Sequence, residues 1–276
     1  MGGSATYASL AVSPYTTASL VGVVGKDFGS QPLELLRSQN IDLQGLTVED
    51  GKTFFWDGEY NSTFTSRTTH RTDLNVFADF YPHIPESLVH TPYVLLGNID
   101  PELQIAVLEQ LKTPQFTVAD TMNFWIERKK PALESMLRRV DVFILNEEEA
   151  RQLTGVYALA KVAKQLLSLG PSIVIIKQGE YGAMLFHSEY TYSVPALPLE
   201  TMQDPTGAGD SFAGGFLGYL AKQQDTSPSS LRQAMVFATA SASLCVEGVG
   251  TQGLFDTNLA RLKERCIQIE SLCRLH

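Results

Sequence analysis

A stretch of small residues that ends in a carboxylate is the part of the sequence best suited to chemistry. Residues 204–216 read DPTGAGDSFAGGF, so Gly207, Ala208 and Gly209 open a predicted helix that starts near Asp210. Unpaired backbone N–H groups and the positive end of a helix then converge on one point, which favours phosphate binding. A carboxylate at the rim of such an anion hole accepts a proton when a hydroxyl attacks phosphorus. A plain helix cap is the better explanation of a G-x-G-D pattern alone, but this pattern is much longer and more specific.

An acidic cluster follows a second apolar run. Asn146 and Glu149 belong to the sequence NEEE at 146–149, directly after the apolar residues 142–145. They therefore lie at the carboxyl end of a predicted strand, where open α/β sheets bind their ligands. Oxygen ligands of this kind suit a hard cation such as Mg²⁺. The alternative is a helix start whose acidic residues complement the helix dipole.

A glycine-containing turn follows the apolar run at 173–176. It reads KQGEYG, which places Lys177 at the end of the strand and Gly179 and Gly182 three residues apart. Lys177 is a reasonable counter-charge for the phosphates of ATP, although a solvated lysine is the default. Two glycines at this spacing more often form a tight turn between strands than a ligand contact.

Two further segments are candidates by location. Asp120 and Asn123 come after the apolar run at 116–119 and so point to the same ligand edge of the sheet. The sequence GVGTQG at 248–253 has G-x-G-x-x-G spacing, but a predicted helix precedes it. A dinucleotide-binding fingerprint needs a strand there, so this loop is not one.

The order of elements predicts an α/β fold with a mostly parallel central sheet flanked by helices. Between residues 21 and 185, short β-branched runs, turns and stretches of helical spacing alternate, as in βαβ units. The predicted strands are apolar at successive positions, which is typical of strands buried on both faces. They cover 19–24, 93–96, 116–119, 140–145 and 172–176, followed by 190–194. The predicted helices cover 32–38, 101–111, 127–139, 147–153, 156–169, 211–222, 229–247 and 256–275.

Residues 53–75 interrupt this alternation. They are rich in Thr, Ser and aromatic residues with partial alternation, which predicts antiparallel strands or a hairpin outside the main sheet. We interpret them as a small β lid, within about 48–77, on one domain that spans 1–276. The aromatic residues of this lid either stack on a sugar or nucleobase or pack within the lid and a dimer interface. These residues are Phe54, Phe55, Trp56, Tyr60 and Phe64.

Composition excludes several classes of protein. The 276 residues carry 21 basic and 30 acidic side chains, a net charge of −9, and so have no basic field that would attract nucleic acid. Three cysteines without a C-x-x-C pair predict neither a disulfide framework nor a zinc site. There is no apolar run of about 18 residues and no secretory signal. We expect a cytoplasmic protein that binds neither nucleic acid nor a membrane.

These motifs resemble those of the PfkB/ribokinase family of carbohydrate and nucleoside kinases. The family's C-terminal signature is similar to residues 204–216, its glycine pair to Gly2 and Gly3, and its V-G-x-V-G-x-D-x-x-G strand and turn to residues 21–29. The resemblance covers nearly the whole chain. It implies a three-layer ribokinase-like fold and ATP-dependent phosphoryl transfer to a primary hydroxyl of a sugar or sugar-like compound.

The resemblance also implies roles for individual residues. Asp210 would be the general base, and the backbone of residues 207–209 would stabilise the transferring phosphoryl group. Asn146 and Glu149 would organise Mg²⁺, its waters and the phosphates. The residues implied for a monovalent cation such as K⁺ are Asp204 and Thr206. Those implied for ATP are Lys177, Gly179, Gly182, Gly248 and Gly250, and those implied for the acceptor are Gly2, Gly3, Tyr7 and Asp120.

The start of the sequence departs from the family pattern. The family usually carries a first strand, a turn with a substrate-binding aspartate and lid strands before the glycine pair, so we expect the first strand and part of the lid to be missing. Ser4 and Tyr7 stand where ribokinases have a sugar-binding lysine and asparagine, which disfavours ribose. The alternative acceptor is a nucleoside of the adenosine type, and the alternative of another class is a catalytically silent nucleotide- or sugar-binding protein. A homodimer formed through the lid is a family-based expectation.

Overall fold

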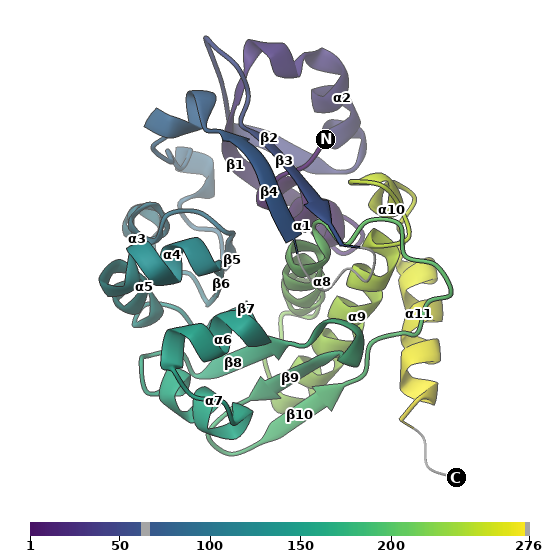
Figure 1. Cartoon of the computed structure of the whole chain (residues 1–276). Coiled ribbons are helices and arrows are strands. Elements are labelled where there is room, and N and C mark those ends of the chain that lie inside the picture. The colour runs from purple at the N-terminus through teal and green to yellow at the C-terminus, as the bar shows by residue number, and fades with distance from the viewer. Residues whose placement is uncertain (62–66, 274–276) are drawn as a thin grey trace.

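A six-stranded sheet forms the centre of the fold. It comprises β5 (Tyr93–Leu96), β6 (Phe116–Asp120), β7 (Val142–Asn146), β8 (Ile173–Lys177), β9 (Ala183–Phe186) and β10 (Thr191–Val194). The computed structural model describes residues 1–61 and 67–273, and in it the strand order is β10-β9-β8-β7-β6-β5 (Figure 1). Strands β5 to β8 run parallel, whereas β9 is antiparallel to both of its neighbours. The predicted mostly parallel sheet is therefore confirmed.

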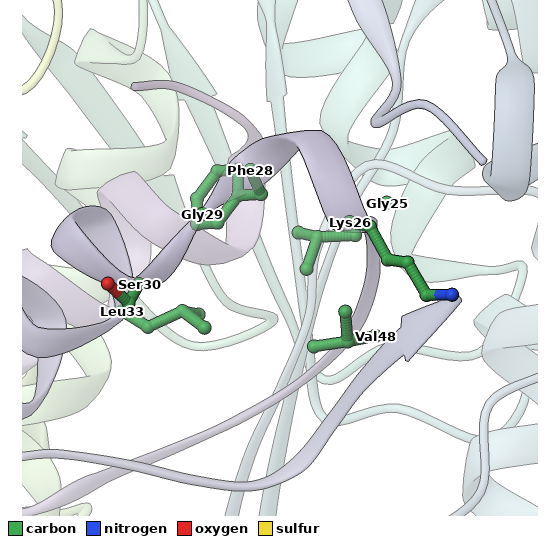
Figure 2. A pocket seen from close by; sticks show the side chains of 8 residues that line it. Gly25, Lys26, Phe28, Gly29, Ser30, Leu33 and Val48 are labelled. Atoms are coloured by element: carbon green, nitrogen blue, oxygen red, sulfur yellow. The ribbon is translucent and has the colours of Figure 1, made fainter. Parts of the chain in front are cut away.

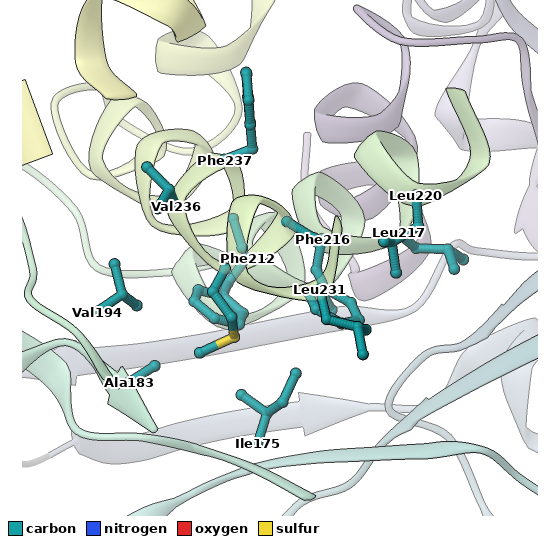
Figure 3. Close-up of a cluster of buried hydrophobic side chains, with 14 of the residues drawn as sticks. Ile175, Ala183, Val194, Phe212, Phe216, Leu217, Leu220, Leu231, Val236 and Phe237 are labelled. Carbon is teal, nitrogen blue, oxygen red and sulfur yellow. The ribbon is translucent and has the colours of Figure 1, made fainter. Parts of the chain in front are cut away.

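Helices cover both faces of this sheet. On one face lie α3 (Pro101–Gln110), α4 (Asn123–Arg128), α5 (Lys130–Leu137), α6 (Glu147–Thr154) and α7 (Leu159–Leu167). On the other lie α8 (Ala208–Gln223), α9 (Pro228–Cys245) and α11 (Leu259–Ser271). Successive side chains of a strand point to opposite faces, so Phe143 packs among the first group and Ile144 among the second. Figure 3 shows the second core, with Phe212 and Phe216 of α8 above Ile175 of β8.

A helix near the N-terminus, α1 (Ser4–Val12), packs directly against α8. The sequence patterns did not predict this helix. Its approach depends on glycines of α8: a methyl group on Gly214 would lie 2.4 Å from the Ala8 carbonyl oxygen, and one on Gly218 would lie 2.7 Å from the Tyr15 ring. Real Cβ atoms do not approach other atoms so closely, so the two backbones are as near as they are because these positions lack side chains.

A smaller β region lies beyond this three-layer body. Strands β1 (Ala18–Gly25) and β2 (Ile41–Glu49) form a parallel pair, and β3 (Phe55–Tyr60) and β4 (Arg67–Asp73) form an antiparallel pair. Figure 1 shows both pairs at one end of the molecule, together with α2 (Ser30–Ser38). The hairpin prediction for 53–75 is confirmed, and β2 was not predicted. The run at 19–24 is a strand as predicted but lies outside the central sheet, because β1 pairs with β2 alone.

Strand β9 was not predicted either, and the remaining differences concern helix bounds. The single helix predicted over 127–139 is two helices, since α4 ends at Arg128 and α5 begins at Lys130 with a proline in its first turn. A short α10 (Gln252–Phe255) precedes α11, and 3₁₀ turns occur at Lys26–Phe28, Asn75–Asp79, Glu86–Leu88 and Gly179–Tyr181. Within the described ranges, none of the helices has the length and apolar character needed to cross a lipid bilayer.

Candidate active site

Three adjacent strands end at the same edge of the central sheet. Asp120, Asn146 and Lys177 are the last residues of β6, β7 and β8, and Asn146 pairs with Lys177 across the ladder. Parallel neighbours bring their carboxyl ends together, so residues far apart in the sequence share one site. The N-terminus of α8 comes to this edge, because a methyl group on Gly209 would lie 2.7 Å from Lys177 Nζ. The structure thus brings together residues from four of the predicted motifs.

The first turn of α8 offers backbone donors at this edge. Gly207, the cap residue, has a φ of 80° in the left-handed region. Ala208 donates its backbone N–H to the Pro205 carbonyl oxygen at 3.2 Å. The helix itself offers no acceptor to the N–H groups of Gly209 and Asp210, and the positive end of the helix dipole lies at the same place. This turn suits an anionic group such as a phosphoryl group.

Asp210 stands in that first turn with a perturbed carboxylate. Burial, helped by the charge of Asp120, raises the pKa of Asp210 to about 6, while the Ser4 hydroxyl and the Lys177 ammonium act in the opposite direction. A carboxylate with a pKa of about 6 is still mostly ionised at neutral pH and accepts a proton more readily than an ordinary aspartate. Its position and its basicity both suit a general base.

Lys177 is a buried cation in this cluster. Its Nζ donates to Asp120 Oδ2 at 3.4 Å, and the two side chains are only 18% and 7% exposed. Burial alone would lower the pKa of Lys177, but the carboxylates of Asp120, Glu149 and Asp210 more than offset it and hold the pKa above its ordinary value. Lys177 is therefore charged, and the default expectation of a solvated lysine is wrong.

Asn146 and Glu149 form a reciprocal cap at the start of α6. Asn146 Oδ1 accepts from the Glu149 N–H at 2.8 Å, and Glu149 Oε2 accepts from the Asn146 N–H at 2.9 Å. Burial raises the pKa of Glu149 to about 7, with Asp120 adding to the rise and Lys177 opposing it. The helix-start alternative for this motif thus applies, and both side chains still lie at the ligand edge.

The donors at this edge fit Mg²⁺ through water and phosphate. In the part of the chain that the structure describes, no group of three or more His, Cys, Asp or Glu residues could enclose a metal ion. Mg²⁺ usually keeps several waters and takes one or two carboxylates together with substrate phosphates. Glu149 Oε1 and the second lone pair of Asn146 Oδ1 are not used by the cap, and they suit this outer arrangement.

Asp204 joins two loops behind the first turn of α8. Its Oδ1 accepts from the Thr206 N–H and its Oδ2 from the Gly250 N–H, both at 2.9 Å. Gln203 donates its backbone N–H to the Val246 carbonyl oxygen at 2.8 Å. The structure therefore brings together Asp204, Thr206 and the 248–250 loop, and it gives the Asp204 carboxylate a structural role at the place where the cation site was predicted.

The glycine turn after β8 is a connection between antiparallel strands. Gln178 donates its backbone N–H to the Gly182 carbonyl oxygen at 2.8 Å, and Gly179 and Gly182 have φ values of 58° and 99°. A methyl group on Gly182 would lie 2.0 Å from the Val194 carbonyl oxygen. The turn interpretation explains both glycines, and their contact with the nucleotide stays a prediction. Gly248 is equally crowded, because a methyl group there would lie 2.4 Å from the backbone nitrogen of Gly253.

Tyr7, near the N-terminus, packs against the first turn of α8. Gly2 and Gly3 are exposed, whereas Tyr7 is only 2% exposed. The Tyr7 ring lies on Gly207, where a methyl group would meet it at 2.2 Å. Burial raises the pKa of Tyr7, as do the nearby charges of Cys245, Asp204 and Asp210. Tyr7 thus packs against the turn at Gly207, and acceptor binding by this side chain stays a prediction.

The lid is tied to the strand-and-turn motif at 21–29. Thr53 donates both its N–H and its hydroxyl to Asp27 Oδ1, at 2.8 and 2.6 Å, and the Gly25 N–H donates to Thr53 Oγ1. Of the predicted lid aromatics, Phe54 and Phe55 are 39% and 48% exposed. Tyr60 is near enough to Tyr7 to contribute to the rise in the pKa of Tyr7. Phe64 lies outside the described residues.

A cavity of about 260 Å³ lies beside this lid region. Figure 2 shows Phe28, Leu33 and Val48 among the side chains that line it. None of its lining residues belongs to the cluster around Asp210. The cavity is therefore separate from the carboxyl edge of the sheet.

Sequence reasoning missed two polar residues at or near this site. Ser4 was noted only as a replacement for a lysine, yet it lies near enough to the Asp210 carboxylate to lower its pKa. Gln104 in α3 is fully buried, and its Nε2 donates to the carbonyl oxygens of Gly97 and Asp120 at 2.9 and 3.0 Å. It ties the ends of β5 and β6 together. A polar residue on the apolar face of α3 was the only signal that could have revealed it.

A buried carboxylate at a helix N-terminus, with a charged lysine beside it at the edge of a mostly parallel sheet, suits phosphoryl transfer in an α/β fold. The family model described as pfkB family carbohydrate kinase matches residues 1–258, and the chain belongs to that family. It is an enzyme that uses ATP to phosphorylate a hydroxyl of a sugar or sugar-like compound.

Individual proteins agree with this assignment. The chain is 32% identical to a cytidine kinase of Thermococcus kodakarensis over 79% of this chain and 78% of the relative. It is 27% identical to a nucleoside kinase of Methanothermobacter thermautotrophicus over 85% of this chain and 74% of the relative. The crystal structure of a fructokinase from Vibrio cholerae, bound to fructose, ADP and calcium, covers 96% of this chain and 91% of its own, with a TM-score of 0.80 and 22% identity. The fold is therefore the ribokinase-like fold that the motifs implied.

Proposed function

We propose that the acceptor is a nucleoside, phosphorylated on the primary hydroxyl of its sugar, and that Asp210 is the general base. The observation that carries the base assignment is the placement of the Asp210 carboxylate in the first turn of α8, with its pKa raised to about 6. A nucleoside is favoured because the cytidine kinase and the nucleoside kinase both match this chain over most of its length. A free sugar is the second candidate, favoured by the carbohydrate-kinase description of the family.

The residues of the site divide the work. Asp210 accepts the proton of the attacking hydroxyl, and the first turn of α8 receives the charge that develops on the transferring phosphoryl group. Lys177, charged and in contact with Gly209, adds positive charge beside that turn. Asn146 and Glu149 would hold Mg²⁺ through its waters, and the ion would supply positive charge that stabilises the phosphates of ATP. In this proposal the 177–182 turn and the 248–250 loop border the nucleotide.

The test is release of ADP from Mg-ATP in the presence of cytidine, adenosine, ribose, fructose or no acceptor. Asp210→Asn keeps the shape of the side chain and removes the base. We expect nucleoside-dependent ADP that falls by about 10³-fold or more in the variant, while its affinity for ATP stays within about threefold. Equal losses of turnover and ATP binding would contradict the base assignment. A preference for ribose or fructose over both nucleosides would move the proposal to the sugar.

The remaining expectations are tested with the same protein sample. A folded chain that binds Mg-ATP but releases no ADP with any acceptor would support the silent binding protein. Replacing K⁺ with tetramethylammonium tests the cation predicted at Asp204 and Thr206, because that larger ion cannot enter a small oxygen-lined site. Light scattering of the same sample tests the predicted homodimer.

A further inference from the structure

The strongest unexplained feature of the site is a buried ion pair between two strands. Asp120 at the end of β6 was predicted to contact the acceptor, and Lys177 at the end of β8 was predicted to contact ATP. In the structure they face each other at 3.4 Å, with side chains that are 7% and 18% exposed. Burying two charges costs free energy, and attraction between them offsets that cost only when their geometry is well held.

Asp120 accepts three hydrogen bonds, two at its carboxylate and one at its backbone carbonyl oxygen. Its Oδ1 accepts from the Thr121 N–H at 2.8 Å, its Oδ2 accepts from Lys177, and its carbonyl oxygen accepts from Gln104 at 3.0 Å. A carboxylate fixed in this way cannot turn to an acceptor without leaving the Lys177 ammonium unpaired in a buried place. The bonds therefore make Asp120 an anchor for Lys177.

Lys177 reaches α8 from this anchor. A methyl group on Gly209 would lie only 2.7 Å from Lys177 Nζ, so the ammonium lies directly against the backbone that precedes Asp210. Ser4 of α1 also lies near enough to Asp210 to lower its pKa. The first turn of α8 thus has a cation of the sheet and a polar residue of α1 beside it.

We propose that Asp120 and Lys177 form a positioning pair for phosphoryl transfer, in which Asp120 holds the Lys177 ammonium against Gly209 and so fixes both the anion-binding turn and the orientation of Asp210. This inference deepens the proposed function and rests on it. It replaces an acceptor contact for Asp120 with an anchoring role, and it makes the contribution of Lys177 depend on Asp120.

The charged groups around the pair set its expected pH behaviour. Asp210 is faced by Asp120 from β6 and Lys177 from β8, with the Ser4 hydroxyl on α1, Cys245 on α9 and Tyr7 also near. Lys177 is faced in addition by Glu149 on α6. Removing the cation leaves the carboxylates to repel one another, which raises the pKa of Asp210, whereas removing the Asp120 charge lowers it.

The experiment compares Asp120→Asn, Lys177→Met and the double variant with the wild type. Lys112→Met, which removes an exposed lysine paired with Glu86 at 3.8 Å, is the control. We expect kcat to fall about 100-fold or more in Lys177→Met and about 10-fold in Asp120→Asn, with the dissociation constant for ATP changed less than about threefold. The double variant should be no slower than Lys177→Met, because Asp120 then no longer stands as a buried carboxylate without its cation. The acidic limb of the kcat–pH profile should move up in Lys177→Met and down in Asp120→Asn.

Several results would overturn the pair. A higher KM for ATP with unchanged kcat in Lys177→Met, together with a silent Asp120→Asn, would reduce Lys177 to a nucleotide contact. Independent effects that multiply in the double variant would also refute it. If a single variant fails to fold, the double variant decides, since both members of the pair are then neutral: wild-type kcat in it refutes the proposal. A wild type without acceptor-dependent release of ADP would instead refute the proposed function. The pair is then judged by urea unfolding of the same variants, in which the combined effect on the unfolding equilibrium constant must differ from the product of the single effects by more than about twofold.

Discussion

Gly207 is a position where a single methyl group should damage this site. Its φ of 80° lies in the left-handed region, where a residue with a Cβ pays about 1–2 kcal/mol. The new methyl group would also lie 2.2–2.4 Å from three atoms of the Tyr7 ring, which is 2% exposed and has little room to move. Overpacking of this kind costs about 1–3 kcal/mol. We therefore expect Gly207→Ala to lower the free energy of unfolding by about 2–5 kcal/mol.

Urea unfolding of Gly207→Ala measures this loss. The matched control is Gly22→Ala in β1, where the nearest side-chain atom would be 3.5 Å from the new methyl group, an ordinary contact. A double variant with Tyr7→Ala separates the two causes, because removing the ring relieves the contact but not the backbone strain. We expect a coupling of about 1–3 kcal/mol between the two sites. A Gly207→Ala protein within about 0.5 kcal/mol of the wild type, or one without coupling to Tyr7, would refute the reasoning.

Three further expectations follow from the same geometry. The pKa of Asp210 is raised in the folded state, so the contribution of this residue to stability is complete below its ordinary pKa of 3.8 and is lost as the pH rises through about 6. Asp210→Asn should therefore raise the unfolding temperature more at pH 8 than at pH 4. An equal rise at both pH values would contradict this. Activity of the wild type should fall below about pH 6 as Asp210 takes up a proton, which a kcat/KM profile measures. Gln104→Ala should cost about 2–3 kcal/mol in urea unfolding, because it leaves buried carbonyl oxygens unpaired, and a loss below about 0.5 kcal/mol would show that water replaces the amide.

Much of the fold follows from local patterns. Three apolar runs that became β6 to β8 are buried on both faces, and such strands are apolar at successive positions whatever their neighbours are, whereas β5 at the edge of the sheet is only partly buried. The start of α8 was predicted within a few residues, because small residues followed by Asp210 carry their own helix-start signal. By contrast, the run at 19–24 has the same composition as a central strand, and nothing local indicates that β1 pairs with β2 outside the main sheet.

The sequence by itself determined which residues could do the chemistry. Asp210, the turn before it, and Asn146 with Glu149 are recognisable because each motif is local: a helix start or a strand end places its residues within one turn of chain. Only the tertiary structure decided what these groups contact. Asp120 and Lys177 are 57 residues apart and meet because β6, β7 and β8 are parallel neighbours. Tyr7 and Gly207 meet because α1 packs on the glycines of α8. Contacts of this range depend on the order of strands and the approach of helices, and no spacing within one segment encodes them.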